Sequence, residues 1–147
     1  MKATIDGFEN VDRILSRLME PEKITKKAVE AATPALVEST QKSIKSAANK
    51  GYATGKLAAS VAATKPKRNK YGTYSVVRPT GYDKDGNSYY ARATYLEYGT
   101  TREKGTIPKN APRPWRQKAV NDAESKCEEL MEQAVADEVK KIEGGGL

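Results

Sequence analysis

The sequence predicts an α+β fold in which a long N-terminal helix, kinked near Pro34, and a long C-terminal helix cover a small antiparallel sheet. Two observations lead to this prediction. Apolar residues recur at three- and four-residue spacing before residue 50 and again after residue 114, which is typical of helices with one buried face. Between these segments, residues 57–98 are rich in valine, threonine and tyrosine and contain glycine-marked turns, which favours strands.

Two helices are expected at the N-terminal end. The first has an apolar face made of Phe8, Val11, Ile14, Leu15, Leu18 and Met19. The second is expected over residues 22–49, with Pro21 suited to its first turn. Its apolar face consists of Ile24, Ala28, Ala31, Ala32, Ala35, Leu36 and Ile44. Because alanine dominates this face, whatever packs on it must come close. Pro34 lacks an N–H group, so it should kink this helix or split it into two pieces.

The strand region and the final helix follow. Thr73–Arg78 is the clearest strand candidate, residues 65–70 form a basic turn or loop between two strands, and residues 81–88 form a second turn. A last helix is expected over residues 114–143. Its apolar side consists of Ala119, Ala123, Cys127, Leu130, Met131, Ala134, Val135, Val139 and Ile142. Residues 1–143 are expected to form a single domain and residues 144–147 a flexible tail.

The net charge of +7 is concentrated in one part of the chain. Residues 39–82 carry nine basic and no acidic side chains, whereas residues 117–147 carry four basic and eight acidic ones. A basic block of this kind attracts polyanions, including duplex DNA, without reading their sequence. It could equally be a solvated surface that pairs with an acidic neighbour such as the C-terminal segment. Both interpretations remain open at this point.

The residue types that enzymes and metal sites need are mostly missing. There is no histidine, and the single cysteine, Cys127, cannot build a zinc site of the usual kinds. Residues 51–57 resemble a phosphate-binding loop but are one residue short and have Leu57 where Ser or Thr must hold magnesium. Asp83, Asp85 and Asn87 are spaced like the start of a calcium loop, but Ser88 occupies the position that requires glycine. We therefore expect no enzyme, no cofactor and no metal, with Cys127 as a small core residue.

The sequence also indicates the cellular compartment in which the protein is made. No run of about 18 apolar residues is present, so we expect no membrane span. The first residues lack the apolar core of a signal peptide, and one cysteine cannot form an internal disulfide. Synthesis in the cytoplasm is expected.

The most specific stretches lie between residues 51 and 120. They are Gly55, Leu57 and Ser60 in a Gly-x-Leu-x-x-Ser element; the pair Tyr90-Ala91; the motif Leu96-Glu97-Tyr98-Gly99-Thr100; and the element Pro114-Trp115, flanked by Arg113 and Arg116. In this order they resemble the gene-ten-like neck and tail-completion proteins of long-tailed phages. Two features depart from that family: Trp115 stands where it often has Phe, and residues 83–88 form a polar insertion.

The resemblance implies a virion structural protein of the head–tail interface. Subunits would form a ring, most plausibly a hexamer, around the DNA channel, with the tail tube or tail terminator protein on one side and the head connector or stopper protein on the other. Lys65, Lys67, Arg68 and Lys70 would then be candidates for contact with DNA or a partner. The rival hypothesis is a non-sequence-specific DNA-binding protein, in which tyrosines such as Tyr71 and Tyr74 stack on bases.

The motif residues also make physical sense by themselves. Glu97 could accept hydrogen bonds from backbone N–H groups of the following loop, or pair with Arg113 or Arg116. Gly99 allows the positive φ that a chain reversal often needs. Trp115 would anchor the last helix onto the sheet. We expect these residues to stabilise the fold rather than to contact a partner directly.

Overall fold

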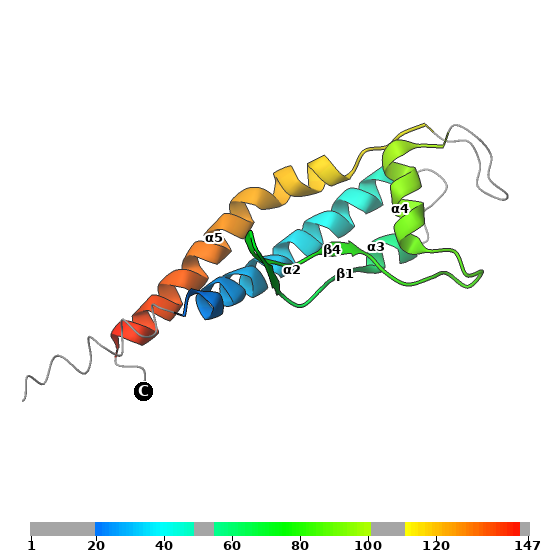
Figure 1. The fold of residues 1–147 in the computed structure, drawn as a ribbon. Helices are drawn as coiled ribbons and strands as arrows, with labels where there is room; N and C mark the ends of the chain where they lie inside the picture. Colours follow the sequence, from blue (N-terminus) through cyan, green and yellow to red (C-terminus); the bar gives the residue numbers. More distant parts are fainter. Residues whose placement is uncertain (1–19, 49–54, 101–110, 145–147) are drawn as a thin grey trace, which may run out of the picture.

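The computed structural model describes residues 20–48, 55–100 and 111–144. Its two longest elements are α2 (Pro21–Ala47) and α5 (Arg116–Glu143), which lie side by side and run antiparallel (Figure 1). The short elements α3 (Lys56–Ala59) and α4 (Tyr89–Tyr98), together with four short strands, complete the fold. The predicted α+β class is therefore confirmed. The helix expected around residues 8–19 and most of the loop over residues 100–112 lie outside the described residues.

Helix α2 runs through Pro34 without dividing, so of the two outcomes expected at Pro34, a kink or a split into two pieces, the split does not occur. Pro34 and Glu30 are both exposed. The Glu30 carbonyl loses its helical donor because proline has no N–H, and it belongs to an exposed residue on which water can replace that donor. The helix begins with Pro21 at its first position, as predicted, and ends where the Ala48 N–H donates to the Ile44 carbonyl.

Small side chains let α2 and α5 approach closely, as the alanine-rich faces predicted. The buried residues of this interface include Ala28 and Ala32 of α2 and Ala119 and Ala123 of α5. Hydroxyl groups of α2 reach across it: Ser39 Oγ donates to the carbonyl of Ala119, at 2.7 Å. A wider residue at these positions would push the two helices apart.

An ion pair joins α2 near its start to α5 near its end. Lys27 Nζ of α2 lies 2.8 Å from Glu138 Oε1 of α5, and Lys141 Nζ lies 3.0 Å from the same oxygen. The hydrogen bond from Lys27, followed by that from Lys141, holds the pKa of Glu138 below its ordinary value. The pair fixes the N-terminal end of α2 next to the C-terminal end of α5.

The strands form two short antiparallel ladders instead of one sheet with long strands. Strand β1 (Val61–Ala63) pairs with β4 (Val77–Pro79), and β2 (Lys67–Asn69) pairs with β3 (Gly72–Tyr74). The strand expected over Thr73–Arg78 is therefore wrong as a continuous strand, because Ser75 and Val76 interrupt it. Three residues, 64–66, connect β1 to β2, but only two, Ser75 and Val76, connect β3 to β4. The pairing register therefore shifts by one residue between the two ladders.

Two further corrections concern the same region. Residues 89–98 form helix α4, although their composition favours strands. Tyrosines favour strands, but the Ser88 hydroxyl caps this helix by accepting the Ala91 N–H. The basic stretch 65–70 is not simply a loop, because Lys67–Asn69 is strand β2. The turn expected over residues 81–88 is present.

The core lies where α2, α3, β1, α4 and the start of α5 meet. It contains Ile44, Ala48, Leu57, Ala58, Val61, Ala93, Leu96 and Trp115. Helix α2 packs against α5 as well as against β1, β3 and β4, so it links the strands to the C-terminal helix. None of the helices in the described residues combines the length and the hydropathy that crossing a bilayer requires.

Candidate functional site

Residues of two motifs, Leu96–Thr100 and Pro114-Trp115, meet at a junction between the end of α4 and the start of α5. The Glu97 carboxylate oxygen Oε2 accepts the backbone N–H of Trp115 at 2.7 Å and that of Arg116 at 3.0 Å. Trp115 occupies the N-cap position of α5, and its own side chain provides no cap hydrogen bond. Glu97 therefore caps α5 from another helix, and its negative charge lies at the positive end of the helix dipole.

Trp115 is the second part of this junction and is only 5% exposed. Its indole Nε1 donates to the Ala93 carbonyl at 2.9 Å, and its own carbonyl accepts the Ser43 hydroxyl at 2.7 Å. One residue is thus tied to α4 by its ring and its N–H, and to α2 by its carbonyl. Trp115 therefore holds the start of α5 through hydrogen bonds to α4 and α2, whereas the sequence predicted that it would anchor this helix on the sheet.

Arg113, in the segment that leads into α5, also links α4 to α2. Its backbone N–H donates to the Leu96 carbonyl at 2.7 Å, and its Nη1 lies 3.4 Å from the Ala47 carbonyl. Both acceptors belong to the last turn of a helix, where carbonyl groups lack intrahelical donors. Arg113 thus satisfies the ends of α2 and α4, and the alternative Glu97–Arg113 ion pair is not formed.

Two motif glycines have left-handed backbone conformations that favour glycine. Gly99 ends α4 with φ of 72°, and its N–H donates to the Tyr95 carbonyl at 2.8 Å. Gly55 precedes α3 with φ of 67°. A side chain at either position would be strained whatever space surrounds it. The positive φ predicted for Gly99 is confirmed.

The remaining motif residues have separate places. Leu57 and Leu96 belong to the core, and the Ser60 hydroxyl donates to the Leu57 carbonyl at 2.6 Å. Ala91 and Thr100 are partly buried, whereas Tyr90, Tyr98 and Pro114 are exposed. Helix α5 begins at Arg116, so Pro114 lies just before the helix instead of opening it. Arg116 Nη1 lies 3.3 Å from the Tyr98 hydroxyl, so the surface of the junction carries an arginine over an aromatic ring.

The basic residues are brought together on the β2–β3 hairpin. Lys65, Lys67, Arg68 and Lys70 are all exposed. Lys70 Nζ lies 4.9 Å from the centre of the Tyr71 ring, and Tyr71 is 84% exposed. Arg68 differs from the other three because it forms an ion pair with Glu22 of α2. In the basic block of residues 39–82, Lys42 also pairs with Glu38, so the ion pairs of the described residues partly neutralise the block through acids of α2 and not of the C-terminal segment.

The Asp83 carboxylate is occupied within its own turn. Oδ1 accepts the backbone N–H groups of Asp85 and Asn87, both at 2.9 Å, and Oδ2 pairs with Arg92 at 3.2 Å. These contacts, led by the backbone hydrogen bond from Asn87, keep the pKa of Asp83 below its ordinary value. Asp83 thus organises a turn and the start of α4, as the simpler interpretation of this stretch predicted.

Cys127 lies on the α5 face that meets α2. Its thiol is partly buried and lies 3.6 Å from the Ala32 carbonyl. Burial raises the pKa of the thiol, which disfavours the reactive thiolate. This placement agrees with a structural role for the cysteine.

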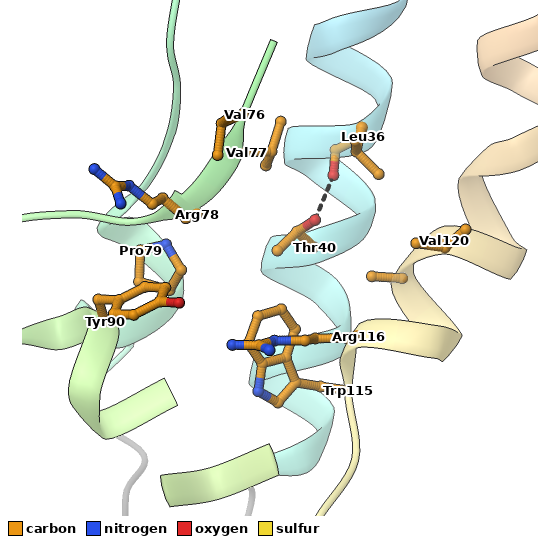
Figure 2. Close-up of a pocket in the computed structure, with 11 residues that line it drawn as sticks. Leu36, Thr40, Val76, Val77, Arg78, Pro79, Tyr90, Trp115, Arg116 and Val120 are labelled. Atoms are coloured by element: carbon orange, nitrogen blue, oxygen red, sulfur yellow. Dashed lines mark hydrogen bonds between the residues drawn. The ribbon is translucent and has the colours of Figure 1, made fainter. Parts of the chain in front are cut away.

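The surface beside the junction contains a groove that the sequence pattern did not indicate. Figure 2 shows it between α2, β4, α4 and α5, with Pro79 and Tyr90 on one side and Val120 on the other. Its volume is about 350 Å³. Val120 was not on the expected apolar side of the last helix, so the helical pattern gave no signal for this surface.

Comparisons with protein-family models, with curated proteins and with solved structures find no match for this chain. A proposal about function can therefore rest only on the motif resemblance together with the geometry of the junction and of the exposed surfaces.

Replacing Glu97 by alanine should destabilise the protein far more than replacing Lys67. The first change leaves two N–H groups at the start of α5 without their acceptor, which costs about 1–3 kcal/mol. Lys67 is exposed, and its replacement should change the free energy of unfolding by less than about 0.5 kcal/mol. Thermal and denaturant unfolding of both variants measures the difference. Equal midpoints would contradict the capping role of Glu97.

Proposed function

We propose that this chain is a structural subunit of a tailed-phage neck, which joins tail to head as a ring around the DNA channel. The observation that carries this proposal is the meeting of separate motif elements in one hydrogen-bonded junction. The Leu96–Thr100 motif supplies Glu97, and the Pro114-Trp115 element supplies the N–H groups that this carboxylate binds. Two motifs that resemble one family in sequence are thus in direct contact, although Glu97 and Trp115 are 18 residues apart in the chain.

The distribution of surface groups supports a role in assembly. Motif residues such as Leu57, Leu96 and Trp115 are buried, so they hold the fold and leave partner contacts to other surfaces. The exposed candidates are the basic β2–β3 hairpin and the apolar groove. In a ring, copies would meet through heterologous contacts that close, most plausibly as a hexamer to match a sixfold tail. Lys65, Lys67 and Lys70 would meet packaged DNA through its phosphates alone.

The partners in this proposal are the tail tube or tail terminator on one side and the head connector or stopper on the other. The protein would be made in the host cytoplasm and then reside in the virion. The hairpin and the groove lie on different parts of the molecule. Strand β3 packs against the N-terminal half of α2, and Arg68 of β2 pairs with Glu22, whereas the groove lies beside Thr40. One subunit therefore has separate surfaces for more than one neighbour.

A second function is favoured by a specific observation on the hairpin. Tyr71 is largely exposed and has the Lys70 ammonium group over its ring. An exposed aromatic ring beside lysines is the combination that binds single-stranded nucleic acid by stacking and phosphate contact. A non-sequence-specific DNA-binding protein is therefore the alternative.

The neck proposal predicts that assembly depends on a partner. The isolated chain should sediment as a monomer or a weakly associated species, and it should form a closed ring when mixed with tail tubes of the phage or prophage that encodes it. Analytical sedimentation, followed by electron microscopy of the mixture, measures this. A stable twofold dimer that tail tubes leave unchanged would contradict the neck proposal.

The alternative predicts a different outcome on DNA. A variant with alanine at Lys65, Lys67, Arg68 and Lys70 should lose micromolar binding of the isolated chain to short DNA at about 150 mM salt. The matched control removes four other exposed lysines, Lys26, Lys45, Lys118 and Lys140, and so lowers the net charge equally. Fluorescence anisotropy measures both. Weaker than micromolar binding by the unmodified chain would contradict the alternative and leave the neck proposal standing.

A further inference from the structure

The groove beside the junction is largely apolar and reaches the surface. It is formed by α2, β4, α4 and the start of α5 (Figure 2). Three large apolar side chains that line it stay exposed: Val76 by 40%, Tyr90 by 46% and Val120 by 49%. Exposed apolar side chains that gather around a hollow are typical of a surface that another molecule covers.

The charges that line the groove are all positive. Arg78 lies over the Tyr90 ring at 5.7 Å, and Arg116 lines the groove from the start of α5 (Figure 2). No acidic residue lines it, and Glu124, one turn beyond Val120 along α5, is not among the lining residues. Neither arginine forms an ion pair within the described part of the chain. A partner that fits the groove therefore combines an apolar side chain with carboxylates.

Helix α5 presents a face with this composition further along its length. Val135 belongs to the apolar side that the sequence predicted for the last helix, yet it remains 38% exposed. Glu128 and Glu132 are exposed on the same side of the helix, because they lie seven and three positions before Val135. These three residues form the Val135 face.

The two glutamates of this face have no positive partner on their own helix. No lysine or arginine stands three or four positions from Glu128 or Glu132. The ion pairs that α5 makes within the described residues include neither of them. Because they lie four positions apart, their like charges repel each other, and a cation from another molecule would relieve that repulsion.

One molecule cannot bring the groove and the Val135 face together. Val120, at the rim of the groove, and Val135 belong to one continuous helix. They are 15 positions apart in it, which is about 22 Å along its axis. Contact between the two surfaces therefore requires a second copy of the chain. The contact is heterologous, because two different surfaces meet.

We propose that the groove binds the Val135 face of a second copy of this chain. Val135 fills the apolar hollow, and the carboxylates of Glu128 and Glu132 meet the guanidinium groups of Arg78 and Arg116. Repeated around a closed ring, this contact joins neighbouring subunits, and in that respect the inference rests on the proposed neck function. The pairing itself requires only two copies of the chain.

Two variants, measured separately and then mixed, test the pairing. The groove variant is Arg78→Glu, and the face variant is Val135→Glu; both residues are exposed. Sedimentation of the unmodified chain over a range of concentrations should show self-association. Each variant alone should associate at least about tenfold more weakly, because it places a carboxylate against the opposing surface.

An equimolar mixture of the two variants should recover the association, but only as a one-to-one dimer. The face variant keeps an intact groove, and the groove variant keeps an intact Val135 face, so one contact can form. The other two surfaces both carry the added carboxylate and repel each other. Recovery of this kind is specific to a heterologous contact.

Each variant has a control with the same change of charge at an exposed position off the two surfaces. Lys84→Glu, in the turn before α4, matches Arg78→Glu, and Ala136→Glu, about 100° further around α5, matches Val135→Glu. Both controls should associate like the unmodified chain.

The proposal is overturned if either variant associates as well as its control, or if the mixture associates no better than the separate variants. Absence of association of the unmodified chain at about 1 mM and low salt would overturn it too. Ring formation on tail tubes is measured separately. If the mixed variants pair but the unmodified chain forms no ring, the pairing stands and the neck function fails. If the groove variant forms rings as readily as the unmodified chain, the neck function stands and this contact is overturned.

Discussion

The Glu97 carboxylate holds the start of α5 against the end of α4, and the neighbouring contacts depend on that placement. With α5 capped from outside, Trp115 can turn its ring into the core and give its carbonyl to Ser43 of α2. Arg113 then reaches the ends of both α2 and α4. Three helices are thus joined within a few residues. No buried side-chain nitrogen or oxygen in the described part of the chain lacks a hydrogen-bond partner.

The residues that stabilise the junction are different from the exposed residues that are available to contact other molecules. The residues that make the sequence resemble a phage neck protein are mainly those that build the interior of the junction. Contacts with other molecules must come from the surfaces that the junction leaves open, which are the basic hairpin and the groove lined by Arg78 and Arg116. Both surfaces carry positive charge next to exposed aromatic or aliphatic side chains. They suit acidic or polyanionic neighbours in an assembly.

The sequence predicted the parts of the fold that depend on local pattern. The alanine-rich faces indicated the close α2–α5 pair, Gly99 indicated a reversal, and Glu97 was expected to accept backbone N–H groups. Helix α4 was missed because its tyrosines favour strands, while its capping serine is a single residue. The break at Ser75 arises from a register shift between two ladders, and the Ser43 and Arg113 contacts join distant segments. Tertiary contacts of this kind leave no periodic signal in a sequence.

Amide hydrogen exchange at Trp115 and Arg116 tests the capping role of Glu97 most directly. N–H groups at the start of a helix have no intrahelical acceptor, so protection there must come from the Glu97 carboxylate. NMR of the unmodified protein should show both amides protected. In Glu97→Ala they should exchange freely, while the Ala119 amide, which donates to the Trp115 carbonyl, stays protected. Rapid exchange of both amides in the unmodified protein would contradict the account.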